Sequence, residues 1–384
     1  MPQYAVQTDA FTRALLTWKR KTARTETQAR LAWLNERIEY QDSVSKTDSR
    51  SRARTLVGEL EVHARPYPGT YLEAGWQSLH IQAFTNTYGS LDPVQYRQAA
   101  YASWQQQLFR ERAQASLSLR QEWRRGAPTP LMPAAGISYR LTPRLSLSAR
   151  GSRNYRLPTL NDLYWNPGGN PNLRPEDSWS AEAGATYSIL PHPGKWRLSG
   201  QSQLYSSRTR DWIIWLPEGS YWTPQNLQRV WARGIEQAFH LERDLDRCQL
   251  FADLRYTYCR STQQQAIREN DASLHKQLIY VPVHQGHINL GVTGKSYTLI
   301  YEQGFTGKRF TSSDNYGSLP AFATGNLFFS LQKCLAIPRS RKIALGISLR
   351  CDNLWNARYQ VVAGRPMPGR NYLASLSVRG AGKS

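Results

Sequence analysis

Few residues in the sequence have types and spacings that could support chemistry. His284 and His287 could ligate a metal, but an odd offset places them on opposite faces of a strand. The C-terminal Gly-Lys-Ser at residues 382–384 is similar to the end of a phosphate loop, yet Ser377 stands where its first glycine belongs and no helix can follow. No Ser-His-Asp elbow or usable carboxylate pair is present. We therefore predict that the chain is not an enzyme and has no metal site and no cofactor.

Aromatic side chains provide the other candidate site. Tryptophans and tyrosines gather within residues 209–228, which we expect to form a long loop. They could stack on a flat chelate, or they could belong to an aromatic girdle at a membrane interface. Two more aromatic residues lie in an earlier long loop, where the alternative is a purely structural role. The candidate ligand contacts are Tyr164, Trp165, Trp212, Trp215 and Trp222.

The four cysteines do not indicate a metal site. Cys248, Cys259, Cys334 and Cys351 have no metal-finger spacing. Cys248 and Cys259 lie at opposite ends of one candidate strand and cannot meet each other. We predict that all four are unpaired.

The composition favours either a soluble protein or one that spans a membrane as β-strands. The chain has 384 residues and a mean hydropathy of −0.59. No run approaches the roughly 20 apolar residues that a spanning helix needs. The 13 Trp and 21 Tyr exceed the 10 Phe, and rings with a polar group suit a membrane interface. A carbohydrate-binding or nucleic-acid-binding β protein could show the same excess.

The net charge of +21 indicates an anionic partner. Nucleic acid is one candidate, and a lipid surface dense in phosphate is another. The basic residues are scattered through the chain, mostly opposite apolar neighbours, rather than gathered in one patch. This distribution favours a polar lumen with charged rims, so we predict no nucleic-acid binding.

Alternation of apolar and polar residues is the main structural signal. Residues 145–150, 250–258 and 343–350 are apolar at every second position, with Phe251 as the only break. Because neighbours in a strand point to opposite faces, each segment has one apolar and one polar face. Earlier strands are expected near residues 11–20, 25–40, 53–65, 71–86, 95–110 and 113–125, with a polar loop at 41–52. The total is about seventeen strands, with an error of two.

Short and long breaks alternate from Leu131 onward. The short ones are residues 141–144, 191–194, 244–247, 294–295 and 337–340, and the long ones are 154–176, 209–228, 261–279, 305–319 and 353–370. This sorting is typical of an all-β, transmembrane antiparallel β-barrel, whereas a sandwich or propeller has no reason for it. If the short turns face the periplasm, the first and last strands both run inward. We therefore expect at least one further strand before Met1.

Two segments resemble a known family. The first is RNYRLPTLNDLYW at residues 153–165, continued by GGNPNLRPE at 168–176, and the second is DNLWN at 352–356, followed by GRPMPGRNY at 364–372. Both resemble the C-terminal barrel of TonB-dependent outer-membrane receptors, within which the vitamin B12 and catecholate-siderophore branch is most similar. The resemblance is specific from about Ala135 to Val378 and only architectural before that.

The resemblance implies uptake of a large nutrient such as a siderophore–metal chelate or cobalamin. Family barrels have 22 strands and are filled by an N-terminal plug. We expect about 17 of these strands here, in one barrel domain over residues 1–379 with a short basic tail at 380–384, and no plug. The implied partners are outer-membrane lipid and lipopolysaccharide, the barrel-assembly machinery, TonB only through the plug that this chain lacks, and an unidentified transported ligand. The implied location is the outer membrane of a Gram-negative bacterium.

Most positions of the two family motifs are expected to be structural. Prolines stiffen the loops and remove backbone donors, and asparagines favour Asx-type turns. These positions are Asn170, Pro171, Asn172, Pro175, Glu176, Asn353, Leu354, Pro366, Pro368, Gly369 and Arg370.

Three alternative functions remain open from the sequence. Family barrels usually end on an aromatic residue, whereas here Val378 is followed by RGAGKS. This departure and the missing plug leave a truncated non-functional remnant or an unplugged passive pore as alternatives. A soluble basic β protein that binds nucleic acid or polysaccharide is the third.

Overall fold

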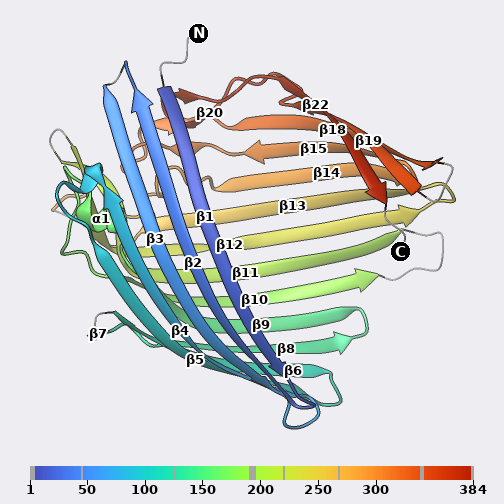
Figure 1. The fold of residues 1–384 in the computed structure, drawn as a ribbon, viewed down its shortest axis with the longest axis horizontal. Coiled ribbons are helices and arrows are strands. Elements are labelled where there is room, and N and C mark those ends of the chain that lie inside the picture. The colour runs from blue at the N-terminus through green and yellow to red at the C-terminus, as the bar shows by residue number, and fades with distance from the viewer. Residues whose placement is uncertain are drawn as a thin grey trace. The chain divides into compact units, whose positions relative to one another are not determined.

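A computed structural model describes residues 5–44, 46–124, 127–189, 196–218, 221–266, 269–337 and 341–381. Most of the described chain is β-strand (Figure 1). Its two helical elements are a single 3₁₀ turn, η1 (Asn86–Tyr88), and a five-residue α-helix, α1 (Leu160–Tyr164). No helix in these ranges is both long and apolar enough to cross a membrane.

Seventeen described strands are ten residues or longer, as the alternation predicts. They are β1 (Ala5–Lys21), β2 (Thr25–Asp42), β3 (Thr47–Ala64), β4 (Thr70–Thr85), β5 (Val94–Leu108), β6 (Ala113–Arg124), β8 (Met132–Thr142), β9 (Leu145–Arg156), β10 (Glu176–Ile189), β11 (Arg197–Glu218), β12 (Tyr221–Asp244), β13 (Cys248–Gln263), β14 (His284–Gly294), β15 (Tyr297–Thr306), β18 (Phe322–Ile337), β19 (Arg341–Asp352) and β22 (Asn371–Ala381). The short strands are β7 (Ala127–Pro128), β16 (Arg309–Phe310), β17 (Ser318–Leu319), β20 (Gln360–Val362) and β21 (Arg365–Pro366).

Long strands that follow one another in the chain pair with each other in antiparallel fashion. Continuous registers join β1 through β6 to β8, and a second series joins β13, β14, β15, β18, β19 and β22. Such hairpin pairing satisfies the backbone amides and carbonyls within neighbouring strands, as a membrane-spanning sheet requires. Two small hairpins, β16–β17 and β20–β21, lie within the loops.

The chain forms two compact units, and most of β1–β8 and the loop that carries α1 belong to the first. Unit 1 comprises residues 1–139, 149–181 and 207–230, and unit 2 comprises residues 140–148, 182–206 and 231–384. In unit 1, β4 and β6 place large apolar side chains on one face, among them Leu72, Trp76, Leu117 and Leu119, and all four are exposed. The opposite face carries charged and amide side chains.

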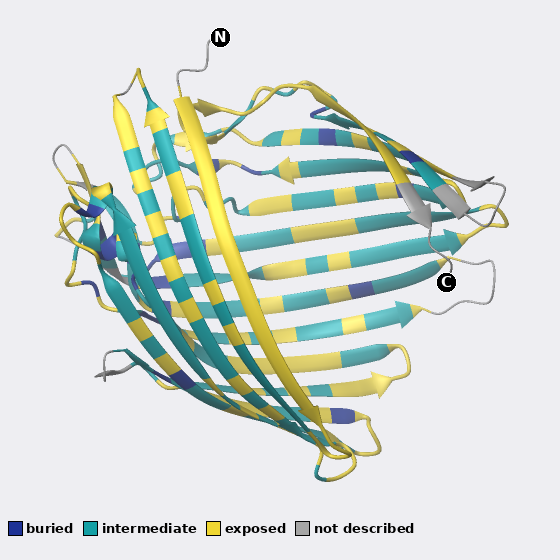
Figure 2. Cartoon of the chain, viewed as in Figure 1, coloured by how far each residue is buried: buried dark blue, intermediate teal, exposed yellow. Residues whose placement is uncertain are grey.

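Unit 2 has the same two-faced strands. Leu254, Ile288, Leu299 and Leu331 are exposed on successive strands although they are aliphatic. Figure 2 shows exposed stretches interspersed with half-buried ones along these strands. Apart from prolines and glycines, the buried apolar residues in the described ranges are Tyr88, Ala99, Ala113, Leu163, Leu173, Ile213 and Val230. The apolar surface is therefore directed outward, which suits a hydrocarbon environment rather than water.

Glycines on the strands make room for aromatic rings on the neighbouring strand. Phe251, the break in the alternation of β13, lies directly opposite Gly291, and a Cβ at Gly291 would be 2.1 Å from the ring. Gly75 is covered in the same way by Tyr101, its partner in the register. In each cross-strand pair, the aromatic ring fills the space that is free because glycine has no side chain.

Two expected loops are mostly strand. Most of the polar segment 41–52 belongs to an extended hairpin, in which β2 ends at Asp42 and β3 begins at Thr47. Glu39 and Arg50 are register partners in that hairpin. The segment 209–228 is also mostly strand, because β11 ends only at Glu218 and β12 starts at Tyr221. The short breaks 191–194 and 338–340 lie outside the described residues. At the C-terminal end, β22 continues into the expected tail as far as Ala381.

Adding a methyl group at Gly291 should destabilise the sheet. In Gly291→Ala the new Cβ collides with the ring of Phe251, so we expect a loss of about 1–3 kcal/mol in the free energy of unfolding. The matched control is Gly58→Ala in β3, because nothing lies within 4 Å of a Cβ there. Thermal unfolding of the detergent-solubilised chain measures both. Equal midpoints for the two variants would contradict the packing role of Gly291.

Candidate functional site

The loop between β9 and β10 is organised by α1. Thr159 caps the helix: its Oγ1 accepts from the backbone N of Asp162 at 3.1 Å, and an Asp162 carboxylate oxygen accepts from the backbone N of Thr159 at 2.8 Å. This reciprocal pair satisfies two amides that a helix start otherwise leaves unpaired. It lets five residues form a helix in an otherwise irregular loop.

Asp162 also connects the loop to the extended end of β11. The other oxygen of its buried carboxylate accepts from Nε1 of Trp215 at 2.9 Å. Glu176, at the start of β10, is buried as well and accepts from the backbone N of Ile213 at 2.8 Å and from Arg156 at 2.5 Å. These charge-assisted hydrogen bonds hold the strand extension against the loop.

A small apolar cluster completes the packing. Leu163, Leu173 and Ile213 are buried together, and Tyr164 packs against them. The ring centroid of Tyr88 in η1 is 6.3 Å from that of Tyr164, and its hydroxyl donates to Oδ1 of Asn161 at 2.5 Å. Burial, and then the nearby Asp162 carboxylate, raise the pKa of Tyr88, so the phenol stays neutral and remains a donor.

The family-motif asparagines in this loop differ in role. Nδ2 of Asn170 donates to the backbone O of Pro224 in β12 at 3.1 Å, and its Oδ1 accepts from the backbone N of Asn172 at 3.0 Å. Asn172 itself is exposed. Asn170 thus forms an Asx-type turn and ties the loop to a strand 54 residues later.

A polar cavity of about 630 Å³ lies beneath this loop, on the polar face of unit 1. Its lining comes from the loop end of β4–β6, from η1 and from the start of the α1 loop. The residues that carry its chemistry are Tyr88, Arg97, Arg120, Glu122, Tyr155 and Arg156.

The cavity contains more positive than negative charge. Arg97 donates to both carboxylate oxygens of Glu122 at 2.6 and 3.1 Å, and Glu122 is 3% exposed. Arg120 lies 3.8 Å from the same carboxylate and donates to Oε1 of Gln77 at 2.7 Å. One carboxylate therefore balances two arginines, whereas the third guanidinium of the lining, that of Arg156, is paired with Glu176. Such a cavity can accept anionic or strongly polar groups.

None of the aromatic residues predicted to contact ligand lines this cavity. Tyr164 and Trp215 are half-buried and engaged in loop packing, and Trp212 is also half-buried. Trp165 and Trp222 are 40% and 56% exposed. The arginines and Glu122 are not among the residues predicted from the sequence, because only the strand register brings side chains from different strands together. The only indication of them in the sequence is that Arg97, Arg120 and Glu122 are charged residues at polar-face positions of two neighbouring predicted strands.

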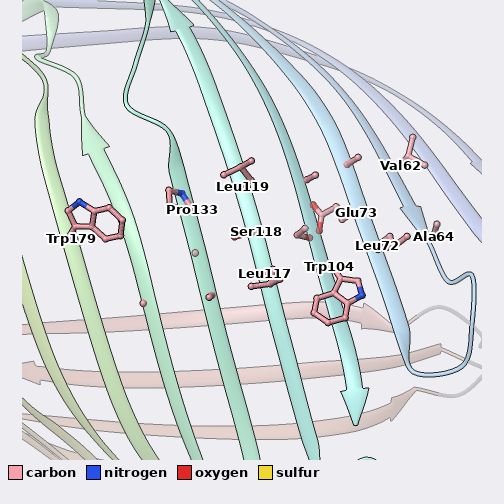
Figure 3. A pocket seen from close by; sticks show the side chains of 16 residues that line it. Val62, Ala64, Leu72, Glu73, Trp104, Leu117, Ser118, Leu119, Pro133 and Trp179 are labelled. Carbon is pink, nitrogen blue, oxygen red and sulfur yellow. The ribbon is translucent and has the colours of Figure 1, made fainter.

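A second hollow in unit 1, of about 780 Å³, is apolar and carries no recognisable chemistry (Figure 3). Trp104 and Trp179 flank it, and Leu117 and Leu119 lie between them. Alanines such as Ala102 form part of its lining. It belongs to the apolar face, where packing against hydrocarbon is the expected role.

In unit 2 the second motif is also built around a buried asparagine. Nδ2 of Asn353, which is 4% exposed, donates to the backbone O of Ala357 and Pro368, and its Oδ1 accepts from the backbone N of Ala357 at 2.8 Å. The backbone N of Leu354 donates to the O of Gly325 at 2.6 Å, and the indole of Trp355 covers that glycine. The motif therefore folds the loop back onto β18.

The rest of the second motif also makes backbone contacts. The backbone N of Arg370 donates to Oδ1 of Asn356 at 3.0 Å, and a Cβ at Gly369 would lie 2.8 Å from the same oxygen. Pro366 lies in β21. These positions shape the loop that leads into β22.

Arg309 joins two loops of unit 2. It is 3% exposed, and its guanidinium donates to the backbone O of Gln360 at 3.0 Å and of Pro320 at 2.8 Å. The guanidinium also lies 4.8 Å from the ring centroid of Phe322. Burial lowers the pKa of Arg309, and the two carbonyls and the ring compensate in part for the lost hydration.

The candidate metal and thiol groups are separate in the structure. His284 and His287 both lie in β14 at an odd offset, and Nδ1 of His284 is 2.8 Å from the hydroxyl of Tyr256. No cluster of three or more His, Cys, Asp and Glu side chains that could hold a metal ion occurs among the described residues. Cys248, Cys259 and Cys351 are free, and the side chain of Cys334 lies outside the described part.

The family profile described as "TonB dependent receptor-like, beta-barrel" matches residues 4–354. This match covers most of the chain. The chain belongs to the TonB-dependent receptor-like β-barrel family. It is therefore an all-β, antiparallel transmembrane barrel protein, as the strand pattern and motifs predict, and no plug is present among the described residues.

The TonB-dependent receptor relatives include transporters of different cargo. "Vitamin B12 transporter BtuB" of Photobacterium profundum is 28% identical over 192 residues, which are 48% of this chain and 28% of that protein. "Copper transporter OprC" has a TM-score of 0.74 at 13% identity, over 97% of this chain and 65% of that one. The siderophore receptor PirA from Acinetobacter baumannii has a TM-score of 0.73 at 12% identity, over 98% and 63%.

This family member therefore spans less than two thirds of these relatives. The structural likeness shows the fold alone. The TonB-dependent receptors to which it is similar are outer-membrane proteins.

Removing the Asn170 side chain should loosen the α1 loop. Asn170→Ala loses the hydrogen bonds to Pro224 and Asn172, which we expect to cost about 1–2 kcal/mol of local stability. Asn172→Ala is the matched control in the same loop. Hydrogen–deuterium exchange of residues 157–175 measures the effect. Faster exchange in both variants, or in neither, would contradict the tie to β12.

Replacing Arg309 should release the loop that contains β20. Arg309→Met keeps much of the chain length but loses both hydrogen bonds to carbonyls, which we expect to cost about 2–3 kcal/mol. The neighbouring exposed Lys308→Met is the control. Limited proteolysis of residues 353–370 should accelerate only for Arg309→Met. Unchanged cleavage would show that the loop is held by other contacts.

Proposed function

We propose that this chain forms the membrane-spanning part of a TonB-dependent receptor for a siderophore–metal chelate or cobalamin. The observation that carries the proposal is the polar cavity beneath the α1 loop, with three arginines and a single carboxylate in its lining. Membership of a transport-receptor family supports it. Catecholate chelates are anionic and cobalamin contains a phosphate, so both present groups that guanidinium binds well.

The exposed aromatic residues add a second set of ligand contacts in this proposal. Trp165 and Trp222 are the most accessible of the predicted contacts. Tyr164, Trp212 and Trp215 support the loop that presents them. The motif residues from Asn170 to Glu176 and from Asn353 to Arg370 act through the backbone contacts that they make.

The proposed location is the outer membrane, with lipid and lipopolysaccharide around the apolar face. The barrel-assembly machinery would insert the chain, and TonB would act only through a plug. A fragment that has lost transport and an unplugged pore are alternatives that the same experiments separate.

The test is uptake by cells that make the chain from its own gene. Arg120→Ala should lower uptake of radiolabelled cyanocobalamin or of a ferric tris-catecholate about tenfold, because Arg120 lines the cavity and one charge-assisted hydrogen bond to the ligand is worth about 1.5–3 kcal/mol. Arg140→Ala, an exposed arginine of β8 outside the cavity lining, is the control.

The uptake experiment is combined with planar-bilayer conductance and with detection of the chain in the outer membrane, and each outcome has one meaning. A loss for one compound and only for Arg120→Ala supports the receptor and identifies its ligand class. Equal uptake by both variants contradicts the role of the cavity. Ion conductance in planar bilayers without ligand-dependent uptake indicates a passive pore, and absence of the chain from the outer membrane indicates a remnant.

A further inference from the structure

Three short turns of unit 1 lie together at one end of its strands (Figure 1). They join β1 to β2, β3 to β4 and β5 to β6. The backbone N of Arg65 in the second turn donates to the O of Arg24 in the first turn at 2.8 Å. The backbone N of Gln107, near the end of β5, donates to the O of Gly69 in the second turn at 2.8 Å. These hydrogen bonds connect the neighbouring turns, so this end of unit 1 presents one fixed surface.

A polar hollow of about 800 Å³ lies among these turns. Its volume is within the range of about 300–1,000 Å³ that is typical of ligand sites. Four glutamines, two tyrosines and two arginines contribute to the lining, and no carboxylate does among the described residues. The residues that carry its chemistry are Arg24, Arg65, Tyr67, Gln105, Gln107 and Gln114.

Tyr67 is presented on a stiff turn. Pro66 and Pro68 restrict the backbone on both sides of it, and Gly69 adopts a φ of +75°. The backbone N of Thr70 donates to the O of Tyr67 at 3.1 Å and closes the turn. Tyr67 is nevertheless 73% exposed. A ring that is held in place but left uncovered can stack on a flat ligand face with little loss of conformational freedom.

The glutamines are oriented by contacts with their neighbours. Nε2 of Gln114 donates to Oε1 of Gln105 at 3.1 Å, and Oγ1 of Thr70 donates to Oε1 of Gln106 at 2.6 Å. Nε2 of Gln106 donates to the backbone O of Gln107 at 2.9 Å. Because each side-chain amide has two N–H donors and an acceptor oxygen, Gln105 and Gln114 retain hydrogen-bonding capacity for a ligand. The side-chain amide of Gln107 forms no hydrogen bond within the described part of the chain.

Two guanidinium groups make the hollow positive. Arg24 and Arg65 are exposed, and neither forms a salt bridge with a described carboxylate. The cavity beneath the α1 loop differs in this respect, because Glu122 offsets part of its charge. Guanidinium pairs best with carboxylate or phosphate groups. A ligand of the hollow is therefore expected to carry an acidic group.

The combination of amides, an exposed aromatic ring and unpaired guanidinium groups matches an acidic, N-acetylated glycan. Hydroxyl and acetamido groups need both donors and acceptors, which glutamine amides supply. The C–H face of a sugar ring can stack on an aromatic ring, and a carboxylate can pair with arginine. The short turns of outer-membrane barrels face the periplasm, where the cell wall is a glycan with these groups.

We propose that the hollow binds the peptidoglycan of the cell wall. Tyr67 stacks on a sugar ring, Gln107 and its neighbouring glutamines bind the acetamido and hydroxyl groups, and Arg65 pairs with a carboxylate. This contact would anchor the chain to the wall. The proposal rests on the outer-membrane location in the proposed function, but it does not depend on the transported nutrient.

The experiment measures co-sedimentation of the full chain, extracted in detergent, with purified peptidoglycan sacculi. Tyr67→Ala should weaken binding about tenfold, because the stacking surface is lost. Its control is Tyr316→Ala, which removes an 89% exposed tyrosine from a loop of unit 2. Since both rings are exposed, the thermal midpoint should be unchanged in both variants.

A second arm tests the acidic group with chitin, which is N-acetylated but has no carboxylate. The parent should bind sacculi about tenfold more tightly than chitin, and Arg65→Gln should remove this preference. Arg140→Gln, an exposed arginine outside the hollow, is the control. Equal loss in the two arginine variants would indicate general attraction to a basic surface and would overturn the site.

Selective loss of sacculus binding in Tyr67→Ala and Arg65→Gln supports the site. Parent-like binding by Tyr67→Ala overturns it, as does equal binding of sacculi and chitin by the parent. Displacement by lipopolysaccharide core oligosaccharide as effective as displacement by soluble peptidoglycan fragments overturns the assignment to the cell wall. Should Tyr67→Ala lower the thermal midpoint, Gln107→Ala provides the reading, and parent-like affinity there overturns the site.

The proposed function is tested separately by cell fractionation and uptake. Cells that make Tyr67→Ala should take up nutrient as the parent does, because the hollow lies apart from the cavity beneath the α1 loop. Loss of sacculus binding in the parent with normal uptake contradicts the glycan site alone. Absence of the parent chain from the outer membrane contradicts the proposed function.

Discussion

Pairing of backbone amides and carbonyls between neighbouring strands is the constraint on which the rest of this structure depends. A chain that crosses hydrocarbon has no water to satisfy these groups, so it must cross as helices or as paired strands. Long antiparallel registers such as those of β2 with β3 and of β18 with β19 meet this requirement. Once the backbone is paired, side chains can only point to one face or the other. The apolar face is exposed and the charged groups gather opposite it.

This arrangement leaves little room for an ordinary apolar core. The cluster of buried apolar residues in the described part of the chain is small, and it lies under the α1 loop rather than between strands. Stability within the sheet depends instead on cross-strand contacts, such as Phe251 over Gly291. In the loops, buried polar groups such as Asp162 and Asn353 stabilise the fold, because each forms hydrogen bonds with several partners. A buried polar group that is fully paired fixes one geometry, because any other leaves it unsatisfied.

Charges are sorted by face as well as by position along the strands. On the polar face, Arg97 and Arg120 share the carboxylate of Glu122. On the outward face of β2 and β3, Arg37 and Arg52 meet each other instead. The first arrangement produces a preorganised cavity with a modest positive excess. The second leaves two like charges directly opposite each other on an exposed face. Positive charge is therefore placed in at least two physically different settings.

The sequence by itself determined the strand number, the two-faced character of the strands and the family, because period-two alternation and the loop motifs are local signals. It could not determine where β11 and β12 end, because their extensions depend on contacts of Ile213 and Pro224 with a loop far away in the chain. It could not identify the cavity either. Arg97 and Glu122 lie 25 residues apart, and only the register between β5 and β6 brings them together. Local patterns specify which face a side chain takes, whereas its partners across the sheet are decided only when the strands pair.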